Sequence, residues 1–140
     1  MRGSWIAASG ALAVGVAMAG LAGNAGAQPG IRPVRIGLAG PALDACLSLA
    51  EVRGVNRETG NVLIVRAIPR IGAIPLDRLA PGRQVWICDG DAMPGWTGIV
   101  YAERPGQDCG VAAPVASPQS YAGPCRTGWV ASRYLAVIAG

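Results

Sequence analysis

The four cysteines are the residues of this 140-residue chain whose chemistry is easiest to constrain. They form an even set without any Cys-x-x-Cys spacing: Cys46, Cys88, Cys109 and Cys125. Zinc sites usually contain such close pairs, and a thiol nucleophile usually needs a histidine base, which the chain lacks. We therefore expect two disulfides and no metal site.

The pairing of these cysteines follows from the composition between them. The stretch from Cys109 to Cys125 is rich in Gly, Pro and Ser, so a disulfide there would staple a loop with few other constraints. That leaves Cys46 to pair with Cys88. Of the three possible pairings this one is favoured, and a Cys88–Cys125 bond would overturn it.

The acidic residues offer no catalytic arrangement. Asp89, Asp91 and Asp108 lack the spacing and the bidentate twelfth ligand of a calcium loop, so we expect solvated turn carboxylates. No pair of acids is singled out for glycoside hydrolysis, and no nucleophile elbow, phosphate loop or dinucleotide fingerprint occurs. The sequence therefore predicts neither an enzyme nor a bound cofactor.

The aromatic residues are better candidates for contact with a ligand. Trp96 begins an expected strand beside a loop, where an amphipathic ring can meet a ligand, and Tyr134 has a comparable position near the end of the chain. Tyr121 is either a packing anchor of its loop or an exposed contact. Trp129 lies in an apolar strand and is expected in the core.

The elements that must position these residues are strands. Apolar and β-branched runs separated by Gly, Pro and Asn predict a β-rich domain without helical periodicity. The expected strands are 50–55, 62–68, 83–88, 96–101, 126–130 and 135–138, with a single 3₁₀ turn over 132–134. Between them we expect an irregular loop over 69–76, a tight Pro81-Gly82 turn and a long Pro/Gly-rich insertion over 103–124.

The first 27 residues resemble an export signal. One early arginine precedes a charge-free stretch from Trp5, which ends in the small residues Ala25-Gly26-Ala27. Cleavage before Gln28 would leave a chain without a stable membrane span, exported to the periplasm or secreted. A retained anchor is the alternative, although glycines dilute the apolar stretch and no basic cluster follows it.

Charge gives a weaker indication of partners. All twelve basic residues are arginines, set against eight acidic residues, for a formal net charge of +4. The arginines are scattered, so a nucleic-acid interface is not expected. Mild attraction to an anionic cell wall or membrane surface is compatible with this balance.

The order of these elements resembles a bacterial SH3-like (SH3b) domain. The similarity covers about residues 60–138 and rests on Leu63-Ile64-Val65-Arg66, the Leu79-Ala80-Pro81-Gly82 turn, Trp96, and the closing Gly-Trp-Val-x-Ser-x-Tyr-Leu motif of 128–135. The resemblance implies an all-β, five-stranded barrel over residues 48–140. It would be preceded by a linker or N-terminal extension over 28–47 and interrupted by the disulfide-stapled insertion.

The same resemblance implies an exported, non-catalytic module that recognises a cell-envelope component such as peptidoglycan. Its ligand would lie across Trp96 and Tyr134 and neighbouring loop residues such as Arg70, with Tyr121 as a further candidate. Ala131 stands where proline-peptide-binding relatives keep a proline, so that ligand class is not carried over. The alternative is an assembly protein that docks onto another envelope protein, or onto itself, through the insertion. The sequence does not predict an oligomeric state.

Overall fold

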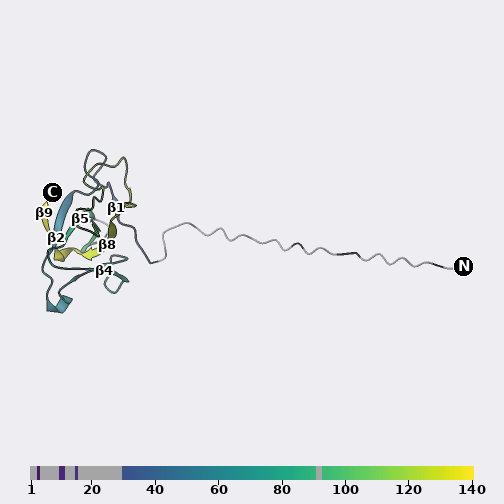
Figure 1. Ribbon diagram of the computed structural model, residues 1–140, viewed down its shortest axis with the longest axis horizontal. Helices are drawn as coiled ribbons and strands as arrows, with labels where there is room; N and C mark the ends of the chain where they lie inside the picture. Colours follow the sequence, from purple (N-terminus) through teal and green to yellow (C-terminus); the bar gives the residue numbers. More distant parts are fainter. Residues whose placement is uncertain (1–2, 4–9, 12–14, 16–29, 91–92) are drawn as a thin grey trace.

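Strands dominate the fold because the apolar residues alternate with a period of two. The computed structural model describes residues 30–90 and 93–140, together with the isolated positions 3, 10, 11 and 15. In this part of the chain the class is all-β, as expected, with two 3₁₀ helices besides the strands (Figure 1). The elements are β1 (Arg35–Ile36), β2 (Ser48–Val52), η1 (Arg57–Thr59), β3 (Leu63–Arg66), β4 (Pro75–Leu79), β5 (Gln84–Asp89), β6 (Trp96–Tyr101), β7 (Gln119–Ser120), β8 (Arg126–Ala131), η2 (Ser132–Tyr134) and β9 (Leu135–Ala139).

The expected signal peptide over residues 1–27 lies outside the described residues, apart from the isolated positions. No helix in the described ranges is long and apolar enough to cross a membrane.

Seven strands form one antiparallel sheet in the order β4-β3-β8-β6-β5-β2-β9, and β1 pairs separately with β7. The ladder does not close on itself, because β4 and β9 are its two edges. The expected closed barrel of five strands is therefore replaced by an open sheet, to which β2 and β4 also contribute. β2 overlaps the strand expected over 50–55, whereas no strand was expected where β4 lies. Both strands pair with their neighbours.

The open sheet nevertheless curls around one inner core. In a flat sheet β4 and β2 would lie five strand spacings apart, roughly 24 Å. Residues of both strands instead belong to the same buried cluster, so the sheet must be strongly coiled. Register shifts in β2, β3 and β5 supply local bends of the kind that β-bulges produce. The inner core consists of Ala50, Val52, Leu63, Val65, Leu79, Val85, Ile99, Tyr101 and Val130.

The predicted bounds of the elements are more accurate from Trp96 onward than in the earlier part of the chain. β6 and η2 begin and end where they were expected, at Trp96–Tyr101 and Ser132–Tyr134. The irregular loop expected over 69–76 is too long, because β4 begins at Pro75. Proline is tolerated there because it is the first residue of an edge strand, where its missing N–H removes little from the sheet.

A second core covers the outer face of the sheet, so β6 is buried on both faces. The N-terminal segment contributes Val34 and Ile36, which are 2% and 6% exposed, and the insertion contributes Val111. Trp129 is fully buried in this outer core, as expected, and its indole Nε1 donates to the Arg32 carbonyl (2.9 Å). Of the two alternatives expected for residues 28–47, a linker or an N-terminal extension, this packing fits the extension from Arg32 onward. The alternation of Val34 and Ile36 was not recognised as a strand pattern because glycines and prolines surround these residues.

Both disulfides belong to this outer layer and follow the expected pairing. Cys46–Cys88 attaches the N-terminal segment to β5, and Cys109–Cys125 links the insertion to the start of β8. Disulfides form in oxidising compartments, so the pair is typical of a protein that works outside the cytoplasm. The outer layer is thus held to the sheet by covalent bonds as well as by packing.

Candidate binding groove

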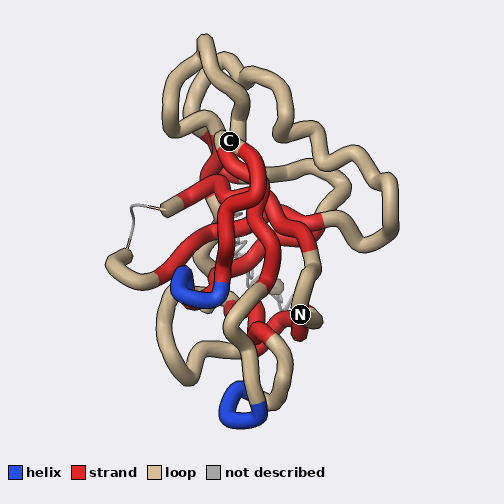
Figure 2. The backbone as a smooth tube through the Cα atoms, turned by 90° about the vertical axis from the view of Figure 1, so that its left-hand side faces the viewer, coloured by secondary structure: helices blue, strands red, loops and turns tan. Residues whose placement is uncertain are grey.

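A groove of about 280 Å³ opens where the start of β6, the end of β8 and the two 3₁₀ helices meet. In Figure 2 both helices, drawn in blue, lie in the lower half of the molecule. Trp96 and Tyr134 both line this groove, so the structure brings together the two aromatic residues expected to contact a ligand. Apolar side chains of Ile64 and Ile71 complete its wall.

Trp96 is fixed at the groove by the way its strand begins. Gly95 has a φ of 79°, a left-handed conformation that glycine adopts without strain, and it turns the preceding loop into β6. The Gly95 carbonyl then accepts a hydrogen bond from the Ser132 N–H (2.9 Å). Trp96 pairs with Ala131 across the ladder. The indole therefore sits beside a small residue that leaves room for a ligand.

Tyr134 is held by the short helix that follows β8. Its carbonyl accepts from the Arg53 N–H (2.9 Å), and its half-buried ring packs against the inner core. The Arg133 guanidinium lies over the ring, 4.8 Å from its centroid, a cation–π arrangement. One face of the ring is thus covered by Arg133, while the ring still lines the groove.

The groove also carries charges that could orient a polar ligand. Arg66 and Arg133 contribute positive charge and Glu58 contributes one carboxylate. Arg66 donates to the Ala73 carbonyl (2.8 Å) and so holds the loop that carries Ile71, a residue that is 80% exposed. Sequence reasoning missed Glu58, Arg133 and Ile71. In the sequence, only Ile71 could have been noticed, because an isoleucine in a loop that contains several Gly and Pro residues is expected to be exposed.

The other two candidate contact residues do not line this groove. Arg70 is exposed on the neighbouring loop, with its backbone N–H bonded to the Ile68 carbonyl (2.8 Å). Tyr121 belongs to the outer core instead: its hydroxyl donates to the Cys109 carbonyl (2.8 Å) and accepts from the Cys125 N–H (3.1 Å). Tyr121 is therefore a packing anchor for the insertion, because both capacities of its hydroxyl are used within the loop.

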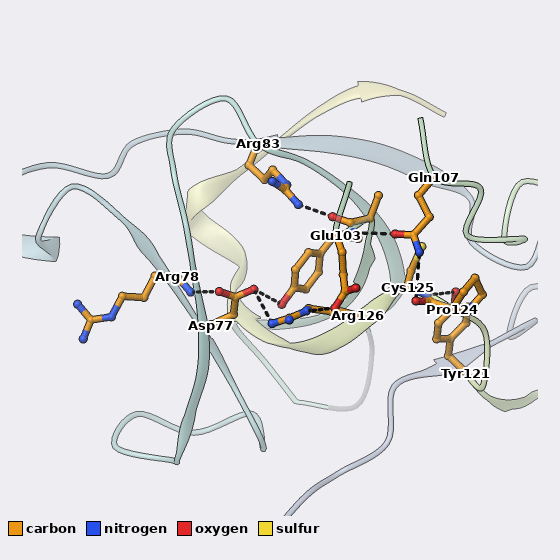
Figure 3. Close-up of polar contacts among 11 residues, drawn as sticks. Asp77, Arg78, Arg83, Glu103, Gln107, Tyr121, Pro124, Cys125 and Arg126 are labelled. Atoms are coloured by element: carbon orange, nitrogen blue, oxygen red, sulfur yellow. Dashed lines mark hydrogen bonds and ion pairs between the residues drawn. The ribbon is translucent and has the colours of Figure 1, made fainter. Parts of the chain in front are cut away.

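A separate polar cluster joins distant strands of the coiled sheet (Figure 3). The Tyr101 hydroxyl of β6 donates to Asp77 of β4 (2.9 Å), and Arg126 of β8 lies between Asp77 and Glu103. Burial raises the pKa of the Tyr101 phenol, and the hydrogen bond to Asp77 raises it further. A phenol that holds its proton so firmly serves as a hydrogen-bond donor, so the cluster is suited to tying edge strand β4 to the sheet.

The aspartates considered for calcium have structural roles where they are described. Asp89 is buried rather than solvated as expected, and its carboxylate accepts from the Arg35 N–H (3.3 Å). Asp108 accepts from the Gly110 N–H (2.8 Å) within a local turn. Asp91 lies outside the described residues. Over 30–90 and 93–140, no group of three or more potential ligands is arranged to hold a metal ion.

Comparison with protein-family models, with curated protein sequences and with solved structures finds no match for this chain.

Proposed function

We propose that the chain is an exported, non-catalytic SH3-like module that recognises a cell-envelope component such as peptidoglycan. One observation carries this proposal. Trp96 and Tyr134, 38 positions apart in the chain by number, line a single groove with charged residues at its rim. Apolar and aromatic walls with a small number of polar groups are typical of sites that bind small ligands.

The arrangement of elements around the groove supports the SH3-like interpretation. The loop after β3, the Pro81-Gly82 turn before β5, and the 3₁₀ helix between β8 and β9 follow the order on which the resemblance rests. Two disulfides support a location outside the cytoplasm, where peptidoglycan is present. Mixed charge at the groove suits a ligand that carries both amine and carboxylate groups, as cell-wall peptides do.

A pull-down on purified peptidoglycan tests this function. Trp96→Ala and Tyr134→Ala should each weaken binding at least tenfold, because truncation of a central aromatic contact commonly costs 2 kcal/mol or more. Val137→Ala is the matched control, since it removes an apolar side chain that is 61% exposed on β9 and does not line the groove. Binding unchanged in both aromatic variants would refute the site.

A second candidate function is docking onto another envelope protein. Leu38, Leu43 and Leu47 of the N-terminal segment are 42%, 49% and 50% exposed, which favours a protein contact on that side of the molecule. The described large apolar residues of the insertion are not among the exposed ones, so docking would use the N-terminal segment more than the insertion. Absence of peptidoglycan binding by the wild-type chain would favour this function.

A further inference from the structure

We propose a second ligand site, for an anionic sugar, where the insertion meets the outer face of the sheet. A cavity of about 350 Å³ lies there, within the ~300–1,000 Å³ typical of small-ligand sites. It is lined by Arg83, Gln84 and Trp86 from the β5 side and by Arg104 and Gln107 from the insertion. It shares no residue with the Trp96 groove, so it is independent of the function proposed above.

The charge of this cavity selects an anion. Its lining contains two arginines and no acidic residue. Arg83 donates to the Ala102 carbonyl, which uses one of its five guanidinium N–H groups. Arg104 forms no ion pair with any residue that the structure describes. Two neighbouring acids have ion pairs elsewhere. Glu51, which pairs with Gln84 in the ladder, binds Arg53, and Glu103, next to Arg104, binds Arg126. Both guanidinium groups thus remain available to a carboxylate or phosphate.

The remaining lining favours a sugar over a bare ion. Trp86 is half-buried between its cross-strand partners Leu49 and Val100, so its ring is held in a fixed orientation at the cavity. A fixed indole offers an apolar face against which a sugar ring can stack. The Gln84 side chain, exposed beside it, supplies an amide donor and acceptor suited to hydroxyl groups.

The insertion wall is preformed, which lowers the entropy lost on binding. The Gln107 amide accepts from the Glu103 N–H (2.8 Å) and donates to the Pro124 carbonyl (3.3 Å), as Figure 3 shows. The Cys109–Cys125 disulfide fixes the same wall a few residues further along. Arg104 therefore projects from a braced segment, and not from a free loop.

An NMR titration that follows the Trp86 indole N–H tests the proposal with three probes: D-glucuronate, glucose 1-phosphate and neutral D-glucose. At least one anionic sugar should shift this resonance at concentrations where glucose does not, and the stronger of the two identifies the anion. The Trp96 indole should not move. Equal effects of all three sugars, or a response at Trp96 in place of Trp86, would overturn the proposal.

Substitution of Arg104 gives the second test. Arg104→Gln should weaken binding of the anionic sugar about tenfold or more, the loss expected for a charge-assisted hydrogen bond. Arg57→Gln, on η1 outside this cavity, makes the same change in net charge and should leave binding unchanged. Equal weakening by both variants would mean nonspecific charge attraction. If inorganic phosphate bound as tightly as glucose 1-phosphate, the sugar ring would contribute nothing to binding, and the proposal of a sugar site would be refuted.

Discussion

The two disulfides provide a test of how the outer layer contributes to stability. They close loops of different length, with sequence separations of 42 for Cys46–Cys88 and 16 for Cys109–Cys125. In the chain-entropy treatment these bonds contribute about 4 and about 3 kcal/mol respectively. The difference, about 0.9 kcal/mol, arises only from the ratio of loop lengths.

Packing losses should cancel in this comparison. Each bond joins one buried cysteine, Cys46 at 1% exposed or Cys109 at 6%, to a half-buried partner. The double variants C46A/C88A and C109A/C125A therefore remove similar buried sulfur, and the former should be the less stable by about 0.9 kcal/mol.

Equilibrium urea unfolding of both variants, followed by circular dichroism and by tryptophan fluorescence, measures the difference. Coincident transitions from the two probes serve as the control for two-state behaviour. Equal losses of stability, or a greater loss in C109A/C125A, would show that packing of the insertion outweighs the entropy of loop closure.

Three further substitutions test the sheet. Gly128→Ala should lower the free energy of unfolding by about 1–3 kcal/mol through overpacking, because a Cβ at Gly128 would overlap a methyl group of Val65. An unchanged urea midpoint would contradict the close approach of β3 to β8. Gly82→Ala should cost about 1–2 kcal/mol from backbone conformation alone, since φ is 83° and the space beside it is open; Ala80→Gly in the same turn is the control. Tyr101→Phe should cost about 1 kcal/mol at neutral pH through loss of the hydrogen bond to Asp77. Because the pKa of Tyr101 is raised in the fold, the unfolded chain releases this proton first as the pH rises above 10.0. The wild type should therefore lose stability there by up to about 1.4 kcal/mol per pH unit. Tyr101→Phe should lack this contribution, and parallel pH profiles for the two proteins would refute it.

The sequence predicted the strands whose pattern is local. The run from Trp96 to Tyr101 is apolar, β-branched and bounded by Gly95, so its bounds were read correctly. β4 was missed because Pro75 begins it and most of its residues are exposed, which leaves no alternating apolar signal. Curling of the sheet depends on register shifts between strands, a property of pairs of segments that no single segment displays.

The groove and the outer core also depend on contacts between distant segments, which no single segment displays. Trp96 and Tyr134 were expected together because each stands at a recognisable boundary of an element. The sequence left Tyr121 open between a packing anchor and an exposed contact, because its role depends on backbone groups of Cys109 and Cys125, which only the folded loop brings within reach. The outer core was not predicted because the buried residues that cover the sheet, among them Val34, Ile36 and Val111, lie in Gly- and Pro-rich segments that show no strand pattern.

The insertion leaves and re-enters the sheet at neighbouring points. Tyr101, the last residue of β6, pairs directly with Arg126, the first residue of β8. Opposed residues of antiparallel strands are separated by only about 5 Å between Cα atoms, so a two-residue hairpin could bridge the same gap. The junction is therefore a natural place to exchange one segment for another without altering the inner core. Any replacement would have to bring an apolar residue in the position of Val111, since the buried ring of Trp129 needs a cover on that face.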